Sequence, residues 1–177
     1  MHKDHLLLLQ KMICLYEGDP RRIQHFLKVY NFASLLGHME QLPEQTQYLL
    51  ETAAIVHDIG IKASEAKYGS SAGKYQEIEG PDISREMLRE AGLAETVIER
   101  VAYLVGHHHT YNIPREIDYQ LLVEADFLVN AYEDTLSLPA IKALGERIFR
   151  SASGKQLLQT IYQSQYHPSN GWLAQRL

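Results

Sequence analysis

The stretch that decides the fold is Ala53-Ala54-Ile55-Val56-His57-Asp58-Ile59-Gly60, an apolar run that contains a His-Asp doublet. His25 precedes His57 by thirty-two residues, and Asp126 follows Asp58 by sixty-eight. Imidazole nitrogens and carboxylate oxygens together form the mixed ligand set that suits Zn, Mn, Fe, Co or Ni. The pattern therefore predicts that separate helices bring these side chains together around one divalent cation.

The dominant hydrophobic period along the chain is helical, and no segment shows sustained strand alternation. His25, Val29, Phe32 and Leu36 fall on one stripe, which predicts a buried position for His25. Ala63–Glu79 is the least periodic part, and we expect a loop there with at most one helical turn. We expect helices over about 1–16, from Pro20, from Pro43 to the doublet, from Gly80-Pro81 to Glu90, from about Val97 to the triple histidine, and over 118–134, 138–150 and 154–165. The predicted fold class is an irregular all-α bundle of many helices.

Length and composition limit the classes of protein to which this chain can belong. A chain of 177 residues with 45% hydrophobic and 22% charged residues is typical of one globular domain, here 1–177. A net charge of −5 argues against a nucleic-acid-binding surface. The apolar patch near the start is too short to span a membrane, so we expect a cytoplasmic protein without a membrane partner. The single cysteine, Cys14, excludes an intramolecular disulfide and is interpreted as a small buried hydrophobe.

Asp126 gives the clearest sign of special chemistry. It lies between Leu122 and Val129 on an otherwise apolar helix face, where an unpaired charge is costly. Its partner is expected to be a metal or an arginine. Taken singly, each candidate is better explained as a paired core residue. Taken together, four such residues on three helices favour a metal site.

The order and spacing of these motifs resemble a known family. Arg22-x-x-His25, the run from Ala53 to Gly60, His108 and Ala125-Asp126 are similar to the HD superfamily of metal-dependent phosphohydrolases. The resemblance covers about residues 20–134, with the terminal helices packed on that core. It implies a bundle of HD-domain type with a central divalent metal held by His25, His57, Asp58 and Asp126. It also implies hydrolysis of phosphate esters or anhydrides, often of nucleotides, by a metal-activated water.

The triple histidine at 107–109 offers a further ligand. His108 continues the buried stripe of its helix and is the favoured candidate, while His107 stays open as a ligand or as a group that orients phosphate. His109 points to a third face and is expected to be solvated. The other histidines fit no pattern and are expected at the surface: His2, His5, His38 and His167.

A second metal depends on Glu79. In family members that hydrolyse diadenosine tetraphosphate, a His-Gly-Pro supplies a ligand to a second ion, and this chain has Glu79-Gly80-Pro81 at that place. Glu is a competent oxygen ligand for Fe or Mn, so the resemblance predicts a second ion on Glu79 and His108, with Asp58 bridging. The alternative is that Glu79 only favours the N-terminus of the following helix. Fe or Mn is expected first, with Mg, Co, Ni or Zn open, as one or two ions per chain.

Two cations near the motifs are candidates for binding substrate phosphate. Arg22 lies one turn before His25, and Lys62 lies four residues after Asp58. With His57 and Asp58 they form the predicted catalytic set, acting on a small phosphate or nucleotide. Two other functions remain open, an HD-like diiron oxygenase and a metal-bound nucleotide sensor without turnover. The sequence also leaves a homodimer open.

Overall fold

Helices make up the fold of the chain. The computed structural model describes residues 2–111 and 116–163, and no strand occurs among them. The α-helices are α1 (Lys3–Leu15), α2 (Pro20–Met39), α3 (Glu44–Val56), α4 (Ile61–Tyr68), α5 (Gly73–Glu90), α6 (Glu95–Val105), α7 (Ile117–Glu133), α8 (Leu138–Ile148) and α9 (Ala152–Leu158). A π-helical turn, Gln159–Gln163, follows α9 directly. The prediction of an all-α bundle is confirmed.

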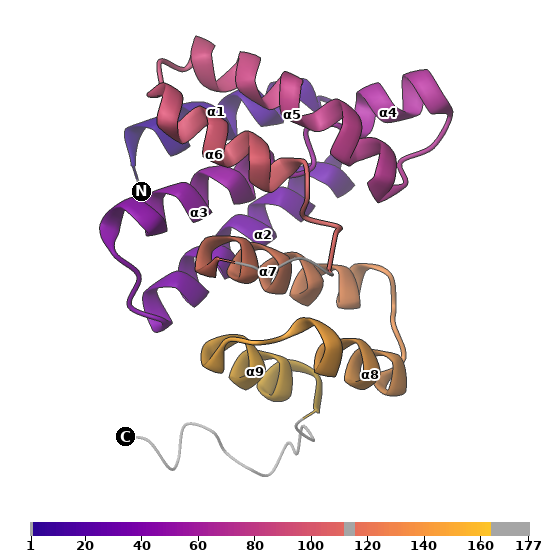
Figure 1. Cartoon of the computed structure of the whole chain (residues 1–177). Helices are drawn as coiled ribbons and strands as arrows, with labels where there is room; N and C mark the ends of the chain where they lie inside the picture. Colours follow the sequence, from indigo (N-terminus) through magenta and orange to yellow (C-terminus); the bar gives the residue numbers. More distant parts are fainter. Residues whose placement is uncertain (1, 112–115, 164–177) are drawn as a thin grey trace.

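The helices α2, α3 and α7 occupy the middle of the bundle. α2 packs against both α3 and α7, and α3 also contacts α7 and α6. As Figure 1 shows, α4, α5 and α6 lie toward one end of the molecule, whereas α8 and α9 lie below α7 at the other end. α1 lies against α3, and α9 contacts α7 and α2. His25 and Asp126 lie on two of these central helices, and His57 directly follows the third.

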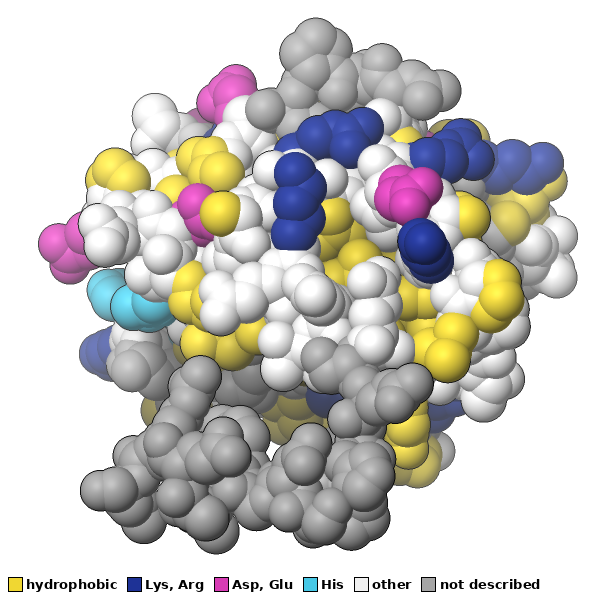
Figure 2. Space-filling model, turned by 90° about the horizontal axis from the view of Figure 1, so that it is seen from below, with side chains coloured by type: hydrophobic (Ala, Val, Ile, Leu, Met, Phe, Trp, Pro, Cys, Tyr) yellow, Lys and Arg dark blue, Asp and Glu magenta, His cyan; other side chains and the backbone are white. Residues whose placement is uncertain are grey.

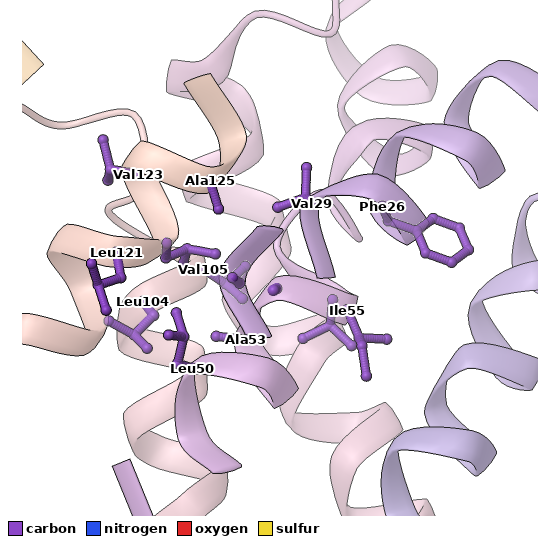
Figure 3. Close-up of a cluster of buried hydrophobic side chains, with 14 of the residues drawn as sticks. Phe26, Val29, Leu50, Ala53, Ile55, Leu104, Val105, Leu121, Val123 and Ala125 are labelled. Carbon is purple, nitrogen blue, oxygen red and sulfur yellow. The ribbon is translucent and has the colours of Figure 1, made fainter. Parts of the chain in front are cut away.

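The core fixes the central helices relative to each other. Side chains from α2, α3, α6 and α7 meet in one cluster, which includes Val29, Leu50, Val105 and Leu121 (Figure 3). All four are completely buried. Burial of apolar surface contributes about 25 cal/mol per Å² and is the main stabilising term. This packing determines where the residues that flank it, including the doublet, are placed.

Local signals explain where the helices begin. The Asp19 side chain accepts a hydrogen bond from the Arg22 backbone N–H, and Pro20 occupies the first position of α2. Ser137 caps α8 in the same way, and the Ser151 hydroxyl accepts from Gly154 N–H at the start of α9. The predicted start of the second helix at Pro20 is confirmed.

The loop predicted over Ala63–Glu79 is wrong. Most of that stretch is helical, because α4 ends at Tyr68 and α5 already begins at Gly73, so Pro81 lies inside α5. A close backbone contact explains the glycines: a Cβ on Gly60 would lie 2.8 Å from the backbone nitrogen of Gly80. Gly80 therefore serves helix packing and does not mark a helix start.

Two predictions about the first helix are also wrong. His5 is buried, with its Nε2 3.0 Å from the Thr52 hydroxyl and its Nδ1 3.2 Å from a Glu51 oxygen. Cys14 is exposed. The reason is the face with which α1 packs on α3, which includes His5 and leaves Cys14 on the opposite side. His167 lies outside the described residues.

The end of the molecule formed by α8 and α9 is basic. Figure 2, which views the protein from that side, shows several Lys and Arg side chains between hydrophobic ones. Residues of this region with positive charge are Lys142, Arg147, Arg150 and Lys155. Within the described ranges, no helix combines the length and the apolar character needed to cross a membrane.

Candidate metal centre

Five side chains from four parts of the bundle converge at its centre. His25 comes from α2 and Asp126 from α7, while His57 is the C-cap residue that directly follows the end of α3 at Val56. Asp58 follows directly, and its backbone carbonyl accepts a hydrogen bond of 2.8 Å from the Tyr16 hydroxyl. His108 follows the end of α6. The structure therefore brings together residues that are up to 101 positions apart in the sequence.

Four of these side chains surround one point. The Nε2 atom of His25 lies 3.2 Å from Nε2 of His57 and 3.3 Å from one oxygen each of Asp58 and Asp126. His57 Nε2 lies 3.5 and 3.6 Å from the same two oxygens. Ligands that bind one ion at about 2.1 Å stand roughly 3.0–3.5 Å apart at its coordination angles. The spacing of the cluster matches that of a metal coordination sphere.

Asp58 connects this cluster to a second group of ligands. Its Oδ2 faces His25 and His57, whereas its Oδ1 lies 3.4 Å from Nε2 of His108. His109 joins the second group, because one of its ring nitrogens lies within 4.8 Å of ligand atoms of Asp58 and His108. Asp58 thus offers one oxygen to each side, which is the arrangement of a carboxylate that bridges two ions.

Hydrogen bonds at Nδ1 orient three of the imidazole rings. His57 and His108 donate through Nδ1 to the carbonyl oxygens of Ala54 and Val105, at 2.9 and 2.8 Å. His25 instead donates to a Glu133 oxygen at 2.9 Å. A proton at Nδ1 leaves the lone pair of the neutral ring at Nε2, so each ring presents a donor atom for a metal.

The charges of the cluster stabilise the ionised forms of Asp58, Asp126 and His25. Burial would raise the pKa of Asp58 and of Asp126, but the neighbouring imidazoles outweigh it and hold both pKa values below the usual range. Burial would lower the pKa of His25, yet its hydrogen bond to Asp126 and the charges of Asp58 and Asp126 raise it to about 9. The two carboxylates are therefore ionised at neutral pH, as metal ligands must be, whereas His25 is protonated there and must lose its Nε2 proton when a metal binds.

Unsatisfied buried nitrogens provide a test of whether a metal fits. Nε2 of His108 and Nε2 of His109 are both buried, and neither has a hydrogen-bond partner. Burial, followed by the charge of His108, lowers the pKa of His109 to about 4, so this ring is a neutral ligand near pH 7. Leaving a buried polar atom unpaired costs about 1–3 kcal/mol, and a bound cation would remove that cost. The residues present fit a divalent metal.

Comparison with known proteins agrees with this geometry. The model of the HD domain family matches residues 22–140, which include every member of the cluster. The chain belongs to the HD domain family. Membership in this family supports a metal-dependent hydrolase as the general class of the protein.

A solved structure supports the fold of this HD domain. The chain is similar to a predicted HD superfamily hydrolase from an uncultured Thermotogales bacterium, with a TM-score of 0.61 and 21% sequence identity. The similarity covers 90% of this chain and 84% of the other. At that identity the likeness concerns the fold alone. The search of curated proteins returned no match.

A pocket of about 520 Å³ opens onto the cluster of His25, His57, Asp58, His108 and Asp126, which we call the HD cluster. His25, Asp58, Asp126 and His109 line it, whereas His57 and His108 have fully buried side chains behind them. The side chain of Asp58 remains 16% exposed, so small molecules reach the cluster from the pocket side. A site of this volume accommodates a small organic ligand.

Three residues predicted for the site lie elsewhere in the HD domain. Glu79 accepts hydrogen bonds of 2.7 Å from Lys67 and Tyr68, and it does not join the cluster because it lies within α5 rather than at its start. Lys62 donates to the carbonyl of Leu15 at 2.5 Å, and it does not line the pocket. His107 also stays outside, since its Nδ1 bonds the Tyr103 carbonyl at 2.7 Å and its ring stacks on Tyr103.

Two residues of the site were missed from the sequence. His109 is half-buried and lines the pocket, contrary to the expectation that it is solvated. α6 ends at Val105, so helical periodicity does not hold for the following residues. Glu133 lies seven residues after Asp126 and therefore on the same face of α7, which is a signal that the sequence did contain. Arg22 lines the pocket, and its role in binding phosphate stays a prediction.

Proposed function

We propose that this HD domain is a divalent-metal-dependent phosphohydrolase that acts on a nucleotide or a related phosphate ester or anhydride. The observation that carries the proposal is the position of Asp58, with one oxygen toward His25 and His57 and the other toward His108. Such an arrangement suits two ions that share a carboxylate, a common design in enzymes of phosphoryl transfer.

The residues of the cluster would hold the metal. His25, His57, Asp58 and Asp126 would hold one ion, and Asp58, His108 and His109 would hold another. A bound divalent cation supplies Lewis acidity, which lowers the pKa of water and offsets charge on a phosphoryl oxygen. Both oxygens of Asp58 face imidazole nitrogens, so we assign this residue the role of ligand rather than of general base.

Arg22 is the best candidate for binding substrate phosphate. Its guanidinium lies on the pocket wall between two carboxylates, 3.2 Å from Asp19 and 2.5 Å from Glu65. These contacts hold the planar group in one orientation, and its side chain remains 27% exposed. A fixed guanidinium binds a phosphate through two parallel hydrogen bonds.

The rest of the pocket supports a substrate with a nonpolar part. Ile61, Phe127 and Tyr111 line it together with the polar ligands. An aromatic or aliphatic wall beside a metal centre is suited to a nucleobase or another flat organic group. Gln76 adds an amide to the wall, with its Nε2 bonded to the Ser71 carbonyl.

The experiment is a turnover assay with a panel of nucleotides. Wild-type protein loaded with Mn²⁺ or Fe²⁺ is compared with Asp58→Asn, and phosphate release and dioxygen consumption are both recorded. We expect phosphate release from at least one nucleotide, and a loss of about 100-fold or more in the variant because the bridging ligand is weakened. Glu79→Ala is the matched control, since Glu79 is an acidic residue outside the cluster, and it should retain activity.

Each of the other results has a clear meaning. Dioxygen consumption without phosphate release would indicate the oxygenase, and nucleotide binding without any turnover would indicate the sensor. Equal phosphate release by wild type and Asp58→Asn would place the activity outside this site.

A further inference from the structure

The first helix carries an apolar stripe that faces away from the core. One side of α1 is buried against the bundle through His5, Leu8, Leu9 and Met12. The other side is exposed along its whole length and pairs with nothing in the described part of the chain. Its residues are Lys3, Leu6, Leu7, Gln10, Ile13, Cys14 and, just after the helix, Glu17.

The spacing of the stripe is that of a helix face that pairs with another helix. Its members recur every three or four residues, which places them in one row along the helix. The apolar members are well exposed, with 46% for Leu6, 39% for Leu7 and 40% for Ile13. A row of large exposed apolar side chains on one helix indicates an interaction surface.

The charges at the two ends of the stripe are complementary under a two-fold rotation. Lys3 and Glu17 lie seven residues to either side of Gln10. If two copies of α1 pack antiparallel about an axis at Gln10, Lys3 of each copy lies opposite Glu17 of the other. Neither residue has an ion-pair partner among residues 2–111 and 116–163. A second copy of the chain supplies one to both.

The helix dipole favours the same pairing. Lys3 lies in the first turn of α1 and Glu17 lies just beyond its last turn. Within one helix these are the unfavourable ends for a cation and an anion. In an antiparallel pair, each charge lies beside the opposite end of the neighbouring helix, where its sign is favourable.

The apolar members of the stripe match in the same register. Leu6 and Cys14 lie four residues to either side of Gln10, and Leu7 and Ile13 lie three. The two-fold rotation therefore places Leu6 opposite Cys14 and Leu7 opposite Ile13 of the second copy. Every position of the stripe meets a suitable partner, as an isologous interface requires.

We infer that α1 is the interface of a homodimer in which two copies of this helix pack antiparallel about a two-fold axis at Gln10. The surface is self-complementary in both charge and apolar character. It lies on the outer side of α1, whereas the HD cluster lies between α2, α3 and α7, so dimer formation leaves the pocket open.

Disulfide trapping tests the register directly. In the proposed pair the two Cys14 residues stand eight residues apart along the axis, about 12 Å at 1.5 Å per residue, which is too far for a disulfide. Wild type should therefore stay uncrosslinked under mild oxidation. Leu6→Cys places a thiol opposite Cys14 of the other copy and should yield a covalent dimer. The double variant L6C/C14S is the matched control and should yield none.

Sedimentation velocity completes the test. Wild type should sediment as a dimer, Leu6→Glu as a monomer, and Lys3→Glu as a weaker dimer that is restored by adding Glu17→Lys. A monomeric wild type would overturn the proposal, as would a dimer that persists in Leu6→Glu. Ready crosslinking of wild type through Cys14, or absence of crosslinking in Leu6→Cys, would overturn the antiparallel register.

Discussion

Glu133 accepts a hydrogen bond of 2.9 Å from Nδ1 of His25, and this contact distinguishes His25 from the other histidines of the cluster. His57 and His108 are oriented by backbone carbonyls, which no side-chain substitution removes. Lys28 donates to the other oxygen of Glu133, also at 2.9 Å. The side chain of Glu133 is therefore fixed and ionised beside a candidate metal ligand.

Glu133→Gln should weaken metal binding while the fold is retained. The amide oxygen still accepts from His25, but the negative charge that increases the basicity of the ring is lost. Loss of such a partner typically costs about 10–100-fold in metal affinity. The measurement is the chelator concentration that removes half of the metal. Asp134→Asn is the matched control, because Asp134 pairs with Arg21 at 3.3 Å and does not contact His25; equal losses in both variants would contradict the role of Glu133.

Arg22→Lys should reduce turnover and leave the metal content unchanged. A lysine keeps the positive charge but cannot form two parallel hydrogen bonds to one phosphate. We expect kcat/KM on a hydrolysed nucleotide to fall about 10-fold or more, which corresponds to at least about 1.4 kcal/mol. Steady-state kinetics and elemental analysis on the same preparation check both statements. Unchanged kcat/KM would exclude Arg22 as the phosphate anchor.

The helical period predicts the ligands that lie within regular helices, whereas the ligands at or beyond helix ends depend on motifs: His57, Asp58 and His108 are expected from theirs, and His109 is not. His25 and Asp126 stand on helical stripes, and the structure places both in the cluster, as the 3.6-residue period indicates. His109 lies after the end of α6, where that period no longer determines direction. Its half-buried position depends on contacts across the fold.

Glu79 shows a second limit of the sequence. In the sequence the Gly80-Pro81 pair favours a helix start, since proline is favoured in the first turn. In the structure the same glycine allows α5 to approach Gly60 closely, and the helix continues through Pro81. Only the contact between the two backbones distinguishes these interpretations, and it is not visible in one sequence.

Gly60→Ala should destabilise the protein. The new methyl group would meet backbone atoms of Gly80 at 2.8–2.9 Å, and a helix backbone cannot move aside easily. Forcing extra volume into a packed site costs about 1–3 kcal/mol. Gly37→Ala is the control, since its methyl group would meet only the end of the Gln47 side chain. Thermal unfolding should show the larger decrease in Tm for Gly60→Ala, and the reverse order would contradict the backbone contact.

Glu51 should make stability depend on pH below neutrality. Burial would raise its pKa, but hydrogen bonds from His5, Gln47 and Ser34 outweigh it and lower the pKa from 4.5 to about 2. A carboxylate whose pKa is lowered in the folded state stabilises the fold at pH values above its pKa in the unfolded chain. That stabilisation is lost as the pH falls from 4.5 toward 2.

The corresponding variant is Glu51→Gln. We expect it to have a smaller free energy of unfolding than wild type at pH 7, and the difference should shrink steadily as the pH falls below 4.5. Denaturant unfolding at a series of pH values measures this difference. A difference that stays constant over the whole range would show that Glu51 does not titrate with a lowered pKa.

The central claim is that the cluster of His25, His57, Asp58 and Asp126 binds a divalent metal. The most direct measurement is elemental analysis of protein purified without chelators, before and after reconstitution with Mn²⁺ or Fe²⁺, for wild type and for Asp126→Ala. The claim predicts one to two ions per chain in wild type and loss of most of the metal in the variant. Wild type that holds no metal even after reconstitution, or Asp126→Ala that holds as much as wild type, would contradict it.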